Sequence, residues 1–303
     1  MLCNLLYMIR IGVVLILRDC EAYLGYLFSQ FVKLESSYKD YISFSYFIYE
    51  NDSVDSTPQL LTQFSNDPEY KGRVHLLCEK HATEYVKDGT SCERIQRIVN
   101  ARNRLLDDLR NKLAQTDWTL MIDSNIYFEP SCLQAMLDVS HKAAIVTCNT
   151  ICVNNNNDIE RSKILEVPRS MPYYTTEHYY DTYAFLDNKL RLLYPQCPSP
   201  LCKEPTCEKS PFKWSKDDSI LRVKSAWGGF VLIDSAAFQH YDVRWEMITV
   251  AEAIQHGIIK TARYLGRIET NAVCEHIPFC KKVCEKLGKP CIVATTITPY
   301  WMR

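Results

Sequence analysis

Apolar runs alternate with helix-period segments through the first half of the chain. Ile9–Leu17 is a continuous, β-branched apolar run, typical of a strand covered on both faces. Further strands are predicted at Phe44–Tyr49, Arg73–Leu77 and Trp118–Ile122. Between them, apolar residues repeat at helical spacing within residues 23–34 and 93–113. This alternation predicts an α/β fold with a Rossmann-type, mostly parallel sheet flanked by helices.

The second half of the chain is less regular. A strand is expected at Ala143–Cys148, and residues 195–218 are rich in Pro, Lys and Cys and predict a long irregular loop. Order resumes at Ile220–Ile233, a helix pattern from about His276 to Leu287 ends at Gly288, and Ile292–Thr298 is expected as a closing strand. No linker is long enough to separate two domains, so residues 1–303 are predicted to form a single domain.

Charge and cysteine content narrow the classes of function. The net charge of −1 over 303 residues provides no basic face for nucleic acid, and we expect no nucleic-acid partner. The apolar run Ile11–Leu17 is too short for a transmembrane segment, and no small-residue cleavage site follows it. We therefore expect a cytoplasmic protein whose 14 cysteines are mostly reduced and buried, with a Golgi lumen setting only if a targeting segment is missing from this chain. Oligomeric state is left open.

Three acidic residues fall at the carboxyl ends of predicted strands, where ligands of parallel sheets bind: Glu50, Asp52 and Asp123. Asp123-Ser124-Asn125 places two oxygen-bearing side chains two positions apart, and hard cations such as Mn²⁺ or Mg²⁺ take oxygen ligands. Turns after strands also carry Asp and Asn because these side chains satisfy turn backbone groups. On local pattern alone, that second explanation is the stronger.

The surrounding sequence resembles a known family. Ala101–Leu106 reads ARNRLL and precedes DWTLMIDSN, and Glu50–Thr57 reads ENDSVDST. Two later segments, Tyr180–Asp187 and Cys274–Cys280, follow in the same order. This ordered set is similar to GT-A-type glycosyltransferases of the fungal mannan-polymerase and capsule-associated mannosyltransferase families. The sequence departs from their pattern at Asn125, where a second Asp is usual, and lacks the late metal-binding His of some relatives.

The resemblance implies site residues and roles, with Mn²⁺ or Mg²⁺ as cofactor. It implies a nucleotide-sugar-binding half at about 1–125 and an acceptor half at about 126–303. The implied catalytic residues are Asp123 and Glu275, the latter for acceptor activation or for stabilising the sugar cation. The other implied sets are donor-binding (Glu50, Asp52, Arg102, Asn103, Asp123), metal-binding (Asp123, Asn125, His276) and acceptor-binding (Trp227, Gly228, Gly229, Asp181, Asp187).

Structural explanations compete for several of these residues. Arg102 could instead form a surface salt bridge with Asp107 or Glu93. Asp52 fits a helix cap, and the paired glycines fit a tight β-turn. A carboxylate at position 275 is favoured by the dipole of the following helix, and a lone histidine such as His276 is more often a structural residue.

The function implied by the resemblance is metal-dependent transfer of a hexosyl group, mannose by analogy. The donor would be a GDP- or UDP-sugar and the acceptor a glycan hydroxyl. Two alternatives remain: a carbohydrate-binding relative with weak or no activity, which Asn125 keeps open, and a nucleotidyltransferase. The latter usually carries a glycine-rich loop after its first strand, where this chain has Leu17–Glu21 without glycine.

Overall fold

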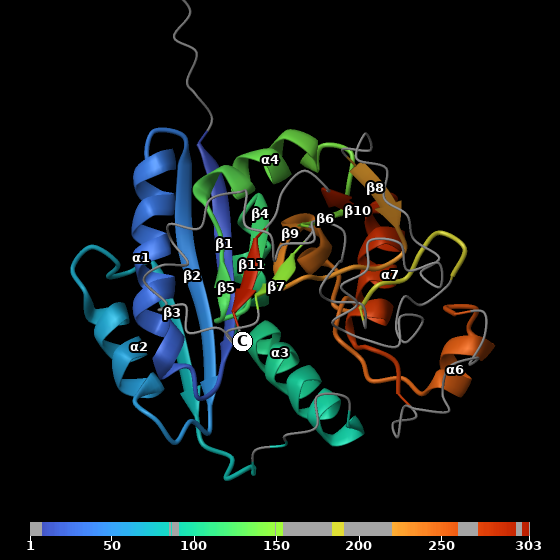
Figure 1. The fold of residues 1–303 in the computed structure, drawn as a ribbon, viewed down its shortest axis with the longest axis horizontal. Helices are drawn as coiled ribbons and strands as arrows, with labels where there is room; N and C mark the ends of the chain where they lie inside the picture. The colour runs from blue at the N-terminus through green and yellow to red at the C-terminus, as the bar shows by residue number, and fades with distance from the viewer. Residues whose placement is uncertain are drawn as a thin grey trace, which may run out of the picture.

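A computed structural model describes residues 8–84, 86, 91–148, 150–153, 184–190, 220–259, 272–294 and 299–302. Its centre is an eight-stranded sheet in the order β3–β2–β1–β4–β9–β6–β10–β8 (Figure 1). The strands, in this order, are Val74–Glu79, Ile42–Asn51, Ile9–Leu17, Trp118–Ile122, Phe230–Asp234, Ile145–Cys148, Cys291–Ala294 and Ile220–Val223. A second sheet has the order β5–β11–β7, formed by Ile126–Tyr127, Tyr300–Met302 and Ile151–Val153.

The first four strands of the large sheet are parallel. β1 pairs in parallel with β2 on one side and with β4 on the other, and β2 pairs in parallel with β3. In chain order, β2 and β3 are therefore added on one side of β1, and β4 is then added on the other side. Such a reversal opens a crevice at the carboxyl ends of the two central strands, where open α/β sheets bind ligands.

The other half of the sheet is mixed. β9 lies between β4 and β6 and is antiparallel to both, whereas β10 is parallel to β6 and β8 is antiparallel to β10. The prediction of an α/β fold with a mostly parallel sheet flanked by helices is confirmed. The two antiparallel strands were not predicted, because an apolar run carries no signal of strand direction.

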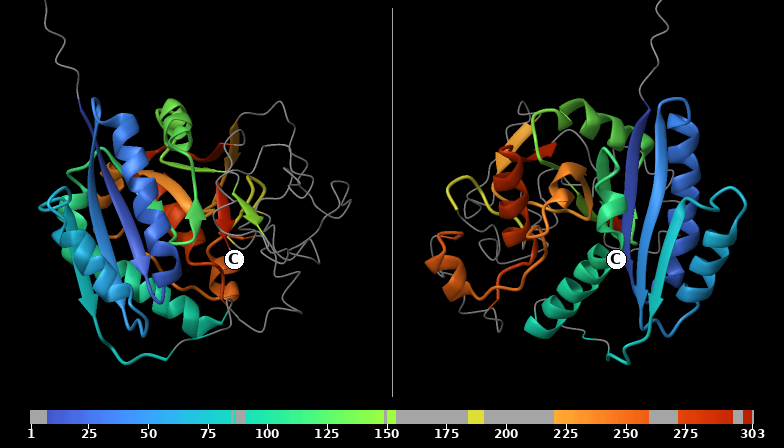
Figure 2. Two further views of the ribbon diagram at one scale, coloured as in Figure 1. Left: turned by 60° about the vertical axis from the view of Figure 1, so that its left-hand side comes forward. Right: turned by 180° about the vertical axis from the view of Figure 1, so that it is seen from behind.

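Helices cover both faces of this sheet (Figure 2). Glu21–Tyr38 (α1), Thr57–Asn66 (α2) and Pro130–Ser140 (α4) pack on one face, and Cys92–Leu113 (α3), Ser235–Gln239 (η1) and His276–Leu287 (α7) on the other. Val250–Gln255 (α6) begins at a Thr249–Glu252 capping box. Consecutive strand residues point to opposite faces of the sheet and belong to two different hydrophobic cores: Val13 packs in the core with α1, and Val14 packs in the core with α3. This two-sided burial explains the uninterrupted apolar runs of the sequence.

The expected elements occur at or near their predicted positions. The strand Trp118–Ile122 and the helix His276–Leu287 match exactly, and Gly288 ends that helix with φ +62°. The predicted loop at 195–218 lies outside the described residues, and so do residues 295–298, the second half of the expected strand Ile292–Thr298. Within the described residues, no helix combines the length and apolar character needed to cross a bilayer.

Candidate functional site

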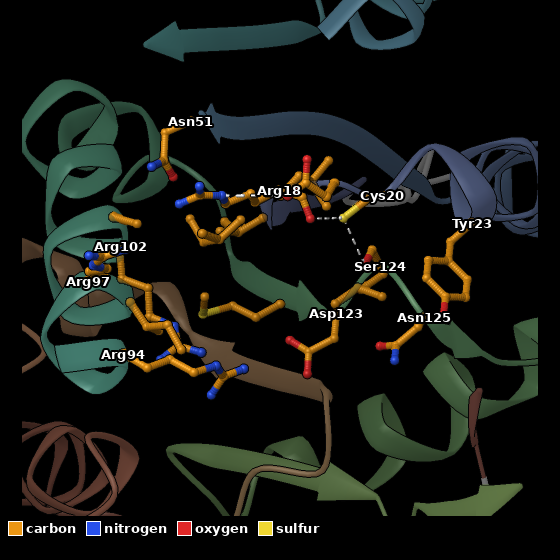
Figure 3. Close-up of a pocket in the computed structure, with 18 of the residues that line it drawn as sticks. Arg18, Cys20, Tyr23, Asn51, Arg94, Arg97, Arg102, Asp123, Ser124 and Asn125 are labelled. Carbon is orange, nitrogen blue, oxygen red and sulfur yellow. Dashed lines mark hydrogen bonds and ion pairs between the residues drawn. The ribbon is translucent and has the colours of Figure 1, made fainter. Parts of the chain in front are cut away.

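A cavity of about 440 Å³ opens at the carboxyl ends of β1 and β4, where the chain reverses its direction across the sheet. Leu17 and Arg18 line it from β1, and Asp123, Ser124 and Asn125 from the turn after β4. One side of α3 forms the opposite wall (Figure 3). The sheet topology thus brings the predicted Asp123–Asn125 turn to the crevice where open parallel sheets bind ligands.

The Asp123 carboxylate faces this cavity (Figure 3). Its backbone N–H donates to the Gly229 carbonyl at 2.9 Å, which extends the β4–β9 ladder by one residue and fixes the start of the turn. Burial raises the pKa of Asp123; the nearby Arg102 charge opposes this rise and the Glu275 charge adds to it. A cation beside Asp123 would favour the ionised carboxylate, because opposite charges lower a carboxyl pKa.

The rest of the turn presents oxygens toward the same space. The side chains of Asp123 and Asn125 point to the same side of the turn in Figure 3. Ser124 points the other way and accepts a hydrogen bond from the Cys20 thiol, with the sulfur and oxygen 3.2 Å apart. One carboxylate and one amide oxygen at a cavity suit Mn²⁺ or Mg²⁺, which prefer oxygen ligands and retain water in the remaining positions. The residues present therefore fit a divalent cation.

Trp227, Gly228 and Gly229 form the turn that packs behind Asp123. The two glycines have φ of +76° and +71°, in the left-handed region. A Cβ at Gly229 would lie 2.9 Å from an Asp123 carboxylate oxygen, and one at Gly228 would lie 2.9 Å from the Thr150 hydroxyl. The glycines therefore allow the β9 turn to approach the Asp123 side chain closely. Only Trp227 of the three lines the cavity.

Four arginines line the same cavity. Arg94, Arg97 and Arg102 project from α3 (Figure 3), and Arg18 follows β1. Arg18 is held in place because its guanidinium donates to the Thr83 hydroxyl and carbonyl at 3.1 and 2.6 Å. Arg18, Arg94 and Arg97 were not predicted as site residues. The spacing of the α3 arginines carried a signal, since Arg97 and Arg102 follow Arg94 by three and eight positions, which are spacings of one helix face.

Arg102 forms a buried ion pair with Glu275, at the start of α7. The two structural alternatives for Arg102 were wrong: Asp107 pairs with Arg244, and Glu93 pairs with Arg97.

His276 is also buried. Its ring stacks on the Trp227 ring, with 3.7 Å between the ring centroids, and its Nε2 lies 3.4 Å from a Glu275 carboxylate oxygen. Burial lowers the pKa of His276 well below its usual value, so its ring is neutral. Burial opposes ionisation of Glu275, but the charge of Arg102 and the hydrogen bond that it donates hold the pKa of the Glu275 carboxyl below its usual range.

A family model described as Cryptococcal mannosyltransferase 1 matches residues 10–264. The chain belongs to this family. The match spans the cavity, the Asp123–Asn125 turn and the α3 arginines. The predicted resemblance to capsule-associated mannosyltransferases is thereby confirmed. Glu275 and His276 lie beyond the matched residues. None of the curated proteins matches the chain.

Two solved structures are similar to this family member over nearly its whole length, at low sequence identity. TarS 1–349 from S. aureus is 14% identical with a TM-score of 0.45, over 97% of this chain and 60% of that one. GalNAc-T7 with UDP, GalNAc and Mn²⁺ is 11% identical with a TM-score of 0.49, over 98% of this chain and 44% of that one. The chain thus spans about 60% of the TarS fragment. Similarity of this degree does not identify a substrate.

The remaining donor residues predicted for this family member, Glu50, Asp52 and Asn103, are not among the described residues that line the cavity. Glu50 is buried and accepts from the Ser53 N–H at 2.9 Å. Asp52 accepts from the backbone N–H groups of residues 81–83 and from the Thr83 hydroxyl, so it fixes that loop, and the cavity wall at this point is Asn51. Asn103 is paired in both directions with the backbone of Trp245, at 2.8 and 3.0 Å. Their donor contacts stay predictions.

Of the two aspartates predicted by resemblance to bind the acceptor, the structure describes only Asp187. Asp187 is 4% exposed and accepts from the Lys189 N–H at 2.9 Å, in a turn of its own. Asp181 lies outside the described residues.

Cys274, Glu275 and His276 place three possible metal-ligand atoms within 4.8 Å of one another. His276 already has Trp245 Nε1 and Glu275 at its two ring nitrogens, and among the described residues the cavity lining holds Asp123 and Asn125 without His276.

Proposed function

We propose that this chain is a metal-dependent glycosyltransferase that moves a mannosyl group from a nucleoside-diphosphate sugar to a glycan hydroxyl. The observation that carries the proposal is the cavity at the carboxyl ends of β1 and β4, which is lined by Asp123 and four arginines. Membership of a mannosyltransferase family supports the sugar assignment. GDP-mannose is therefore the first donor to test, and UDP-sugars are the alternatives.

The charges of the cavity suit a diphosphate. Arginine binds phosphate oxygens through parallel N–H groups, and Arg94, Arg97 and Arg102 present such groups from one helix. A carboxylate in the same space would repel a bare diphosphate, whereas a carboxylate with a divalent cation attracts it. The combination of Asp123 with an arginine wall thus favours a metal–diphosphate complex over either group alone.

Asp123 and Asn125 would hold the cation in this proposal. When bound, Mn²⁺ or Mg²⁺ neutralises the charge that develops on the departing diphosphate. The protein's own contribution is to fix the carboxylate: the Gly229 carbonyl anchors the Asp123 backbone and the β9 turn packs directly against the side chain. The arginines orient the phosphates, and Trp227 provides an apolar wall beside them.

A donor screen tests this function. GDP-mannose, UDP-glucose and UDP-N-acetylglucosamine would be incubated with the chain, with and without Mn²⁺, and release of the nucleoside diphosphate measured. We expect release from one donor that depends on Mn²⁺. Asp123→Asn should reduce that turnover by about 100-fold or more, because metal stabilisation of the leaving group amounts to several kcal/mol.

Asp138→Asn is the matched control, since Asp138 is exposed on α4 and pairs with Gln134. It should retain wild-type turnover. Full activity of the wild-type chain in EDTA, or of Asp123→Asn with Mn²⁺, would contradict the metal assignment. Absence of turnover with every nucleotide sugar, in a folded chain, would contradict the function itself.

A further inference from the structure

Arg102, on α3, is enclosed by side chains from three other segments. Its guanidinium lies 5.8 Å from the Trp227 ring centroid and 5.7 Å from that of Trp245, and the two indoles contact each other edge to face with centroids 6.3 Å apart, so both rings lie against it. The carboxylate of Glu275 pairs with its Nη1. Arg102 is 9% exposed and Glu275 is 5% exposed, which makes this the most buried arginine–carboxylate pair among the described residues.

The enclosure is itself fixed by further contacts. The Trp227 ring stacks on His276. The Trp245 ring stacks on Phe279, with 3.9 Å between the ring centroids and 3° between the ring planes. Asn103, next to Arg102 on α3, binds the Trp245 backbone in both directions. α3, the β9 turn, the loop around Trp245 and the start of α7 therefore meet around one guanidinium.

The two members of the ion pair face different surroundings. Arg102 lines the 440 Å³ cavity, and among the described lining residues Glu275 is absent. One Glu275 oxygen contacts Arg102 and lies 3.4 Å from His276, and the other accepts from the Cys274 thiol at 3.6 Å. Both carboxylate oxygens are thus engaged inside the protein. Arg102 retains a buried donor, Nε, that has no hydrogen-bond acceptor within the described part of the chain.

A buried donor without a partner is costly, and an arginine held in a planar pair keeps its remaining N–H groups in fixed directions. Nε itself is buried beyond a ligand's reach, so an anion in the cavity would instead meet the part of the Arg102 side chain that lines the cavity. We propose that Glu275 is a positioning residue, which holds the Arg102 guanidinium against Trp227 and Trp245 for contact with the donor's diphosphate, and that it does not accept the acceptor's proton. This rests on the proposed function and assigns Glu275 a role different from the one implied by the family resemblance.

Inorganic pyrophosphate is the probe, because it carries the diphosphate without the nucleoside or the sugar. Its affinity would be measured by calorimetry with Mn²⁺ for the full chain, Glu275→Gln, Arg102→Gln and the double variant. We expect Glu275→Gln and Arg102→Gln each to weaken binding at least tenfold. We expect the double variant to bind no more weakly than Arg102→Gln, because Glu275 acts through Arg102.

Glu285→Gln is the matched control: it lies on the same helix, and its pair with Lys281 is exposed. It should bind pyrophosphate as wild type does. If Glu275→Gln does not fold, Glu275→Asp keeps the charge and withdraws the carboxylate by one methylene, and it should weaken binding in the same way. Circular dichroism of each variant confirms the fold before titration.

Three results would overturn the proposal: wild-type affinity in Glu275→Gln, losses that add in the double variant, or no pyrophosphate binding by the wild-type chain. Turnover gives a second readout. Loss of a general base lowers turnover by about 10²- to 10⁴-fold, whereas our account expects a smaller fall at saturating donor. Failure of the glycosyltransferase function would show separately, as pyrophosphate binding that depends on Arg102 without turnover of any nucleotide sugar.

Discussion

Gly229 illustrates how single atoms set the geometry of the site. Its φ of +71° and the 2.9 Å approach of a would-be Cβ to the Asp123 carboxylate leave no space for a side chain. The sequence showed a glycine pair and favoured a tight turn, which is the observed conformation. It could not show that the pair lies against Asp123, because that contact joins residues 106 positions apart, and local pattern carries no such information.

Gly229→Ala should therefore displace the Asp123 carboxylate. The added Cβ meets Asp123 and Ile126, and the left-handed backbone adds about 1–2 kcal/mol of strain. We expect at least a tenfold loss of Mn²⁺-dependent nucleotide binding, measured by calorimetry. Gly257→Ala is the control, since Gly257 has φ +62° but no heavy atom within 4 Å of a Cβ. Equal binding by both variants would contradict the close contact.

At the scale of elements, the connection after β2 is organised by acidic side chains. Asp55 accepts from the Thr57 and Glu21 N–H groups, both at 3.0 Å, which joins the starts of α1 and α2. Asp52 binds the 81–83 loop after β3. The prediction that Asp52 caps the following helix was wrong, because its left-handed backbone, with φ +60°, turns the side chain toward the neighbouring strand end.

Asp52 predicts a specific pH dependence of stability. Burial opposes its ionisation, but hydrogen bonds from Thr83 and His81 outweigh burial and hold the pKa of Asp52 below its usual range. A lowered carboxyl pKa contributes stability that is present above the unfolded-state pKa, about 4, and is lost as pH falls toward the folded-state pKa. Asp52→Asn should thus lower the free energy of unfolding at pH 7, and its difference from wild type should narrow below about pH 4.

Urea unfolding at pH 7, 5, 4 and 3 measures this difference. Asp138→Asn, on the surface of α4, should stay close to wild type at every pH. A gap between Asp52→Asn and wild type that stays constant down to pH 3 would mean that the charge of Asp52 does not hold the 81–83 loop.

Secondary structure was more predictable than side-chain pairing. The strand Trp118–Ile122 was placed exactly because its largely apolar run WTLMI lies between two aspartates, and the end of α7 because Gly288 permits a left-handed cap. The short strands Ile126–Tyr127 and Tyr300–Met302 were missed, since two or three residues carry no periodicity. The Arg102–Glu275 pair spans 173 positions and arises only from the tertiary fold.

At the scale of the whole molecule, one sheet joins both halves of the chain. β4 pairs with β9, so the strand that ends at Asp123 is bordered by residues from the predicted acceptor half. The cavity likewise takes lining from β1, α3, the β4 turn and Trp227. The division at about residue 125 stays a prediction, but the site depends on both sides of it.

The central claim is that Asp123 holds a cation which in turn binds a diphosphate. Calorimetric titration of GDP, with and without Mn²⁺, into wild type and Asp123→Asn tests it most directly. We predict that Mn²⁺ strengthens GDP binding at least tenfold in the wild type and leaves it unchanged in Asp123→Asn. Equal strengthening by Mn²⁺ in both proteins would contradict the account.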